Sequence, residues 1–310
     1  MKPLVIYHAN CADGFGAAFT AWLKFGNEAE YLPMQYNEYL PSEAFLKRDI
    51  YILDFSFERF IMDELFMTAE NVVWLDHHKT AFQMWVGGKF DGTEGDHHQE
   101  DEVRYITLSQ SKSSALLAWE YFHPGIDIPM FIKYIDDYDR WQFKIEGTKE
   151  FNKALWSYVP WSFEQWNHKF SNTYDFLDKQ HLMRNEGEAI LRAHEQNVQT
   201  VVEGATRACV IDLSETNYFD NQINVESACV IGLAANCPPH LASDVGHTLA
   251  TQSGTYGLLW FVDKEGKCKC SLRSNGDYDV SAIAKSFGGG GHNNAAGFEI
   301  DIQILLEWIK

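Results

Sequence analysis

The stretch NVVWLDHH, residues 71–78, decides the fold prediction because a short apolar run changes there into ligand-type side chains. The run Asn71–Asp76 is brief and rich in β-branched and aromatic residues, which is typical of a buried strand. Asp76, His77 and His78 then follow one another, and two neighbouring imidazoles cost desolvation free energy unless they have partners. The pattern therefore predicts a strand that ends in a metal or phosphate site.

Two more runs of this type, Leu4–His8 and Asp49–Asp54, precede it, and segments with helical spacing lie between the strands. Alternation of strands and helices predicts an α/β fold with a parallel sheet. The three runs end in His8, Asp54 and Asp76. Because sites in such sheets lie beyond the carboxyl ends of the strands, we expect these side chains to converge.

The first strand leads into His8-Ala-Asn-Cys-Ala-Asp13-Gly14, where a strand end turns into a helix. Imidazole and carboxylate groups together suit Mn²⁺ or a similar borderline metal. Helix capping explains Asp13 equally well, and it is also open to Asp54, which precedes the helical segment 57–70. The case for these residues therefore depends on the other motifs.

Three further carboxylates, Asp136, Asp137 and Asp139, lie within four positions at the end of a helical segment. Such crowding is costly unless cations share the charge; the alternative is a solvated acidic helix end. Whether Asp137 or Asp139 would be the ligand depends on where the helix ends. A second Asp-His-His triplet, residues 96–98, lacks a preceding apolar strand and is interpreted as solvated surface.

The second half of the chain has a different pattern. Residues 175–202 have the spacing of one long helix, and short apolar strands resume after it. We therefore predict a metal-binding catalytic domain over residues 1–174, a helical linker over 175–204, and a smaller α/β domain over 205–310.

Four glycines, residues 288–291, stand before His292 in the predicted second domain. Glycines allow a phosphate to approach exposed backbone N–H groups, and Arg273 upstream offers a forked cation. The alternative, a flexible linker, does not suit a tract inside a patterned domain.

Composition restricts the partners and the compartment. With 25 Lys and Arg against 44 Asp and Glu, the formal charge is −19, which disfavours binding along extended DNA or RNA. We find no apolar run long enough to span a bilayer and no signal-peptide order at the start. Six sparse cysteines predict a reducing, cytoplasmic protein without a disulfide framework, with Cys209 and Cys229 as buried apolar residues.

Taken in order, these motifs resemble the DHH phosphoesterase family, in the branch with the glycine-rich DHH-associated C-terminal domain. The resemblance spans residues 8–297, and it implies two Mn²⁺ ions, for which Mg²⁺ or Co²⁺ could substitute. The ligands that it implies are His8, Asp13, Asp54, His77 and Asp137, with Asp54 bridging the ions. Relatives usually carry an additional aspartate in the first motif, where this chain has Cys11 or Ala12, so a thiolate ligand or a weaker site is expected there.

The resemblance also implies the remaining roles. Asp76 would support His77, and His78 would contact the scissile phosphate. The residues expected to hold the far phosphate or the terminal nucleotide are Arg273, Gly289, Gly290, Gly291 and His292.

We therefore predict a Mn²⁺-dependent phosphodiesterase that hydrolyses short oligonucleotides or linear or cyclic dinucleotides with a metal-activated water. A polyphosphatase is one alternative, which aromatic residues such as Trp141 disfavour. A nucleotide-binding protein with weak catalysis is another, and the Cys11 departure supports it. The sequence leaves the oligomeric state open, a homodimer included.

Overall fold

The structure, a computed structural model, describes residues 1–310 except 37, 88–95, 171–175, 212–228, 277 and 310. The chain divides into two compact units, Met1–Leu191 and Arg192–Lys310. The domain boundaries expected from the sequence, at residues 174 and 204, are not tested by this division and stay a prediction. Helix α8 (Phe176–Glu203) runs from the first unit into the second, which agrees with the long helix expected there.

The first unit is built on a six-stranded sheet with strand order β2-β1-β3-β4-β6-β5. Its first five strands pair in parallel and β5 joins β6 antiparallel. The strands are β1 (Leu4–His8), β2 (Glu30–Met34), β3 (Asp49–Leu53), β4 (Asn71–Asp76), β5 (His97–Glu100) and β6 (Arg104–Leu108). The three predicted strands are present, and they occupy the centre of the sheet.

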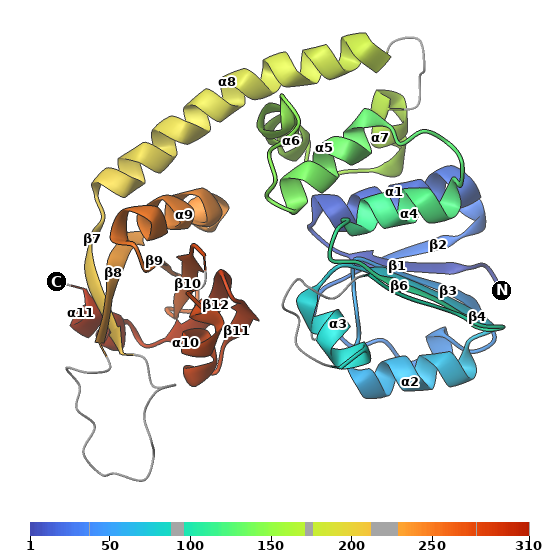
Figure 1. The fold of residues 1–310 in the computed structure, drawn as a ribbon, viewed down its shortest axis with the longest axis horizontal. Coiled ribbons are helices and arrows are strands. Elements are labelled where there is room, and N and C mark those ends of the chain that lie inside the picture. Colours follow the sequence, from blue (N-terminus) through green and yellow to red (C-terminus); the bar gives the residue numbers. More distant parts are fainter. Residues whose placement is uncertain (37, 88–95, 171–175, 212–228, 277, 310) are drawn as a thin grey trace. The chain divides into compact units, whose positions relative to one another are not determined.

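Helices cover both faces of this sheet (Figure 1). Helices α1 (Ala12–Phe25) and α4 (Ser114–Phe122) cover one face, and α2 (Arg59–Thr68) and α3 (Lys79–Trp85) cover the other. Helix α5 (Met130–Asp139) packs on α1 and α4, α6 (Thr148–Ser157) packs on α5, and α7 (Phe163–Phe170) packs on α1. Two short 3₁₀ helices, η1 (Gly26–Glu28) and η2 (Ser42–Ala44), follow α1 and β2. Alternate strand residues point to opposite faces, so β1 sends Val5 and Tyr7 into the core under α1 and α4. Leu4 and Ile6 enter the second core, under α2 and α3. Burial of both faces explains why these strands are almost continuously apolar.

The second unit contains a mixed sheet with strand order β11-β12-β10-β9-β8-β7. Among the strands described in this unit, only β8 and β9 pair in parallel. Its elements are β7 (Thr206–Ile211), β8 (Cys229–Asn236), η4 (Pro239–Leu241), α9 (Ala242–Ser253), β9 (Tyr256–Val262), β10 (Cys268–Ser274), α10 (Val280–Ser286), β11 (Gly290–His292), β12 (Ala295–Ile300) and α11 (Ile302–Trp308). The predicted α/β class, with a parallel N-terminal sheet and a smaller second domain, is confirmed.

One expectation about the cysteines is wrong. Cys209, on β7, is half-buried and disulfide-bonded, whereas the sequence predicted a buried apolar residue in a protein without a disulfide framework. The side chain of Cys229 lies outside the described residues. Cys11, Cys237, Cys268 and Cys270 are free thiols.

None of the helices in the described part of the chain combines the length and the apolar character that a membrane crossing requires.

Candidate metal centre

The carboxyl ends of the three central strands bring imidazole and carboxylate groups together. His8 ends β1, Asp54 follows β3, and His77 follows β4. The distance from His8 Nδ1 to Asp54 Oδ2 is 3.5 Å, and His77 Nε2 lies 3.3 Å from Asp54 Oδ1. Two carboxylates from helices complete the group, since His77 Nε2 lies 3.6 Å from Asp13 Oδ2 and 3.3 Å from Asp139 Oδ2.

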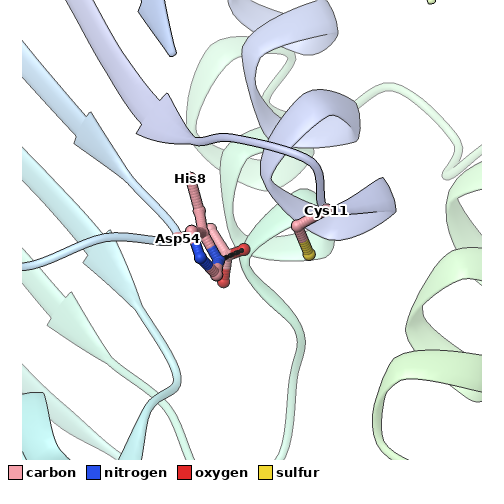
Figure 2. Close-up of side chains that lie close together, drawn as sticks. All are labelled: His8, Cys11 and Asp54. Atoms are coloured by element: carbon pink, nitrogen blue, oxygen red, sulfur yellow. Dashed lines mark ion pairs between the residues drawn. The ribbon is translucent and has the colours of Figure 1, made fainter. Parts of the chain in front are cut away.

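We call this group the strand-end cluster; its members are His8, Cys11, Asp13, Asp54, His77, His78 and Asp139. The cluster contains three overlapping sets of three potential ligands, and within each set the ligand atoms lie within 4.8 Å of one another. The sets are His8–Cys11–Asp54, Asp54–His77–His78 and Asp13–His77–Asp139. In Figure 2, His8 and Asp54 point at each other from neighbouring strands, and Cys11 lies just before α1.

The carboxylate of Asp54 fits a metal ligand because nothing else in the described structure satisfies it. Asp54 is 1% exposed, and neither of its oxygens has a hydrogen-bond partner. The imidazole nitrogens around it lie at 3.3 to 3.7 Å, longer than the roughly 2.7–2.9 Å of a hydrogen bond between charged groups. Buried, unpaired carboxylate oxygens are costly, and imidazole with carboxylate suits a divalent metal such as Mn²⁺ or Zn²⁺. The residues present therefore fit a bound divalent cation.

The charges in the cluster support the same conclusion. Burial and the charges of Asp54 and Asp139 raise the pKa of Asp13 well above its usual value. Burial, followed by the charge of Asp54 among other groups, also raises the pKa of Asp139. Burial alone would raise the pKa of Asp54, but the nearby histidines outweigh it and hold that pKa low. Positive charge placed among these carboxylates, such as that of a bound cation, would relieve their mutual repulsion.

The backbone is strained at two points beside the cluster. Asp54 has φ 56° and Asn10 has φ 55°, in the left-handed region that non-glycine residues rarely adopt. Each such residue costs on the order of 1–3 kcal/mol, and such strain gathers at functional sites. The backbone N–H of Asp54 is held by the carbonyl of Leu75 on β4, at 2.9 Å. With this backbone conformation, the side chain of Asp54 lies in the strand-end cluster.

Asp13 has a second partner that its sequence position did not reveal. Its carboxylate accepts hydrogen bonds from the backbone N–H groups of Ser114, at 2.8 Å, and Ala115, at 2.9 Å. It thus satisfies the first turn of α4, so the capping alternative is correct for a neighbouring helix. Gly14 lets α1 start this close to β1, because a Cβ there would lie 2.4 Å from the carbonyl oxygen of His8.

Asp76 supports a different histidine from the one expected. One of its oxygens, Oδ1, accepts the backbone N–H groups of His77, at 2.7 Å, and His78, at 3.0 Å. The same oxygen lies 2.7 Å from Nδ1 of the His78 ring. Although burial would lower it, the charges of Asp76 and Asp54 raise the pKa of His78 to about 9. Asp76 therefore orients the ring of His78, whereas for His77 it fixes only the backbone.

The three carboxylates of α5 have three different partners. Asp136 pairs with Arg140 through both oxygens, at 3.0 and 2.8 Å, and accepts the N–H of Ser113. Asp137 turns away from the cluster, and Asp139 reaches His77. The expected metal ligand Asp137 is thus not brought to the site, and Asp139, which the sequence left open, takes that place.

Asp137 instead organises the loop after α5. Its carboxylate accepts the backbone N–H groups of Lys144 and Ile145 and the hydroxyl of Thr148, at 2.9, 3.0 and 2.6 Å. These hydrogen bonds lower the pKa of Asp137, although burial alone would raise it. They stabilise a loop in which Trp141 and Phe143 both have positive φ.

Comparison with known proteins agrees with the motifs. Residues 240–309 match the family described as "DHHA1 domain". The C-terminal part of the chain therefore resembles a DHHA1 domain. The chain is 27% identical over 314 residues to Uncharacterized protein R106 of Acanthamoeba polyphaga mimivirus, covering 95% of this chain and 66% of that protein. It is 23% identical over 324 residues to Oligoribonuclease NrnB of Bacillus subtilis (strain 168), covering 96% and 73%.

The chain thus spans just under two thirds of the length of the mimivirus relative. Among solved structures it is similar to the exonuclease RecJ bound to manganese, with 12% identity and a TM-score of 0.46 over 99% of this chain and 88% of that one.

The predicted substrate-binding residues all lie within residues 240–309, the stretch that matches the DHHA1 domain. Gly289 packs so closely that a Cβ would lie 2.1 Å from the carbonyl oxygen of Gly297, and Gly291 has φ +144°. Close packing thus accounts for two of the glycines, whereas a Cβ at Gly290 would meet open space. The side chain of His292 lies outside the described residues.

Arg273, on β10, places its guanidinium beside α9. Its Nη2 atom donates to Ser243 Oγ at 3.3 Å, and its Nη1 atom donates to the carbonyl of Leu272. No carboxylate pairs with it among the residues that the structure describes, and burial lowers its pKa. Its proposed role in binding a phosphate stays a prediction.

The second Asp-His-His triplet, residues 96–98, has a structural role. Asp96 is exposed, but its carboxylate accepts from Ser109 Oγ and the N–H of Gln110, both at 2.9 Å, and from Ser111 Oγ. His98 Nδ1 lies 3.0 Å from Thr107 Oγ1. The triplet therefore ties β5 to the loop that follows β6, and is more than the solvated surface expected.

One aromatic residue at the cluster had no signal in the sequence. Tyr36, between β2 and η2, lies with its ring centroid 5.3 Å from that of His8 and 6.1 Å from that of His78. No motif or periodicity marks it, because only the fold brings this loop to the end of β1.

Proposed function

We propose that this protein is a metal-dependent phosphodiesterase of the DHH family that hydrolyses short oligonucleotides or linear or cyclic dinucleotides. The observation that carries the proposal is the strand-end cluster around Asp54, whose two buried oxygens lack partners. The similarity to a protein named an oligoribonuclease supports a short RNA substrate. The formal charge of −19 disfavours long strands, since it repels an extended phosphate backbone.

Two ions, with Mn²⁺ as the preferred metal, would be held by two of the three ligand sets in the strand-end cluster. One would lie between His8, Cys11 and Asp54, and the other between Asp13, His77 and Asp139, with Asp54 facing both. In this assignment Cys11 supplies the ligand that relatives usually take from an additional aspartate, and Asp139 replaces Asp137. Such ions, when bound, lower the pKa of a coordinated water and neutralise charge on the phosphoryl oxygens.

The chain's own residues would position the substrate. Asp76 holds the Nδ1 side of the His78 ring, so His78 would meet the scissile phosphate through Nε2. A protonated His78, which its raised pKa favours, would donate a hydrogen bond to an oxygen that gains charge in the transition state. Arg273 and the glycine tract would bind the far phosphate. We also propose that the protein acts in the cytoplasm.

The direct test is turnover of a substrate panel by the wild type and by Asp54→Asn. The panel contains di- to pentanucleotides, cyclic dinucleotides and polyphosphate with Mn²⁺, and products are resolved by mass. We expect hydrolysis of the short nucleotides and a loss on the order of 10²–10³-fold in kcat for Asp54→Asn. The matched control is Asp63→Asn, which removes an exposed partner of Arg59 on α2 and should leave kcat unchanged.

Three outcomes would contradict the proposal. Unchanged turnover by Asp54→Asn would remove Asp54 from the mechanism. Hydrolysis of polyphosphate alone would select the polyphosphatase. Nucleotide binding without products in Mn²⁺ would select a binding protein.

A further inference from the structure

The loop after β2 places an exposed aromatic ring against the strand-end cluster. Tyr36 is 41% exposed, although its ring contacts three others. It stacks on the buried Phe55, with centroids 5.1 Å apart and an interplanar angle of 23°. Because one face of the ring is covered by Phe55, the exposed part of the side chain lies away from Phe55.

Backbone and side-chain hydrogen bonds hold this ring in place relative to His8. The N–H of Ala9, next to His8, donates to the carbonyl of Met34 at 2.9 Å. In return, the amide of Gln35 donates to the carbonyl of Ala9 at 2.9 Å. Two hydrogen bonds therefore join Ala9, next to His8, to the chain just before Tyr36. They hold the ring of Tyr36 beside the strand-end cluster.

We propose that Tyr36 is a specificity-determining residue that stacks on a nucleobase of the substrate next to the scissile phosphate. This inference rests on the proposed function, and it deepens it by selecting nucleotides over base-free phosphate chains. Every nucleobase has a π-face, and aromatic side chains are sequence-tolerant platforms for it. The ring lies beside the expected metal ligands, so a base next to the scissile phosphate could stack on it. Inorganic polyphosphate has no base to stack.

Trp141 is a weaker candidate for the same role, although it is equally exposed. Its rings pack on Tyr138 and Phe143. Tyr36, in contrast, contacts the cluster residues His8 and His78 themselves.

The test compares ligands with and without a base in Tyr36 variants. In the presence of Mn²⁺, calorimetry measures the affinities of adenosine 5′-monophosphate and ribose 5-phosphate, and turnover is measured for a dinucleotide and its abasic analogue. Tyr36→Leu should lower the preference for the base-containing ligand and substrate about tenfold, with the base-free pair unchanged. Tyr36→Phe keeps the ring and should behave as the wild type.

Tyr39→Leu is the matched control, since Tyr39 lies in the same loop, is 81% exposed, and should have no effect. The inference is overturned if Tyr36→Leu keeps the preference, if it weakens both kinds of ligand equally, or if Tyr36→Phe is as defective as Tyr36→Leu. The affinity ratio decides this even if no substrate is hydrolysed, whereas missing turnover by the wild type overturns only the proposed function. Thermal unfolding of each variant shows that the fold is retained.

Discussion

The same tripeptide, Asp-His-His, occurs twice at one edge of the parallel sheet and has two different roles. Asp76 is the last residue of the central strand β4 and pairs with Leu108 on β6. On its other side, Leu108 pairs with His97 at the start of β5. The triplet 76–78 faces carboxylates from three other segments. The triplet 96–98 lies on the edge strand and binds serines and a threonine instead. Identical residues therefore acquire metal-binding chemistry only where neighbouring strands and helices supply more ligands.

The largest difference between the triplets is expected at their central histidines. His77→Ala removes the side chain that lies near Asp13, Asp54 and Asp139, so it should weaken Mn²⁺ binding and lower kcat by at least about 100-fold. His97→Ala, the matched change on β5, should leave both within about threefold. Titration calorimetry and initial rates measure the pair. Equal losses in the two variants would show that the triplets do not differ as described.

A smaller effect is expected from the aspartate that supports His78. Asp76→Asn keeps the shape of the residue but removes the charge beside His78 Nδ1, so kcat should fall about 10- to 100-fold. The substitution removes the negative charge that raises the pKa of His78. The loss of activity should therefore appear in kcat more than in KM. Initial rates over a range of substrate concentrations test this, and a change in KM alone would argue against a role of His78 in the transition state.

The smallest effect is expected from Asp96→Ala. This substitution removes the acceptor that Ser109, Gln110 and Ser111 share, each bond being worth about 0.5–1.5 kcal/mol. The expected result is a lower melting temperature, by about 2–4 °C per kcal/mol, with Mn²⁺ affinity retained. Differential scanning calorimetry and a metal titration measure the two quantities. Lost Mn²⁺ affinity at an unchanged melting temperature would make this triplet a metal site after all.

Much of the centre could be predicted because strand ends in a parallel sheet share one edge. His8, Asp54 and His77 follow three apolar runs that adjoin in the sheet, so local pattern and topology agree. Asp137 and Asp139 could not be separated in the same way. Residues two positions apart, such as Asp137 and Asp139, point in directions about 200° apart around a helix. The sequence does not reveal which side of α5 faces the strand-end cluster.

The remaining features depend on contacts between distant segments. Asp13 caps α4 across 101 positions of the chain, and Asp96 ties the start of β5 to the loop that follows β6. Tyr36 reaches His8 only because β2 pairs with β1 in register. No periodicity encodes such contacts, since each requires the sheet order before it can be recognised.

The most direct test of the account is diffraction from crystals grown with Mn²⁺, with data collected at a wavelength where manganese scatters anomalously. The account predicts two anomalous peaks that flank Asp54, one beside His8 and Cys11 and the other beside Asp13, His77 and Asp139. Crystals without a peak at Asp54, or with the ion at Asp96–His98, would contradict it.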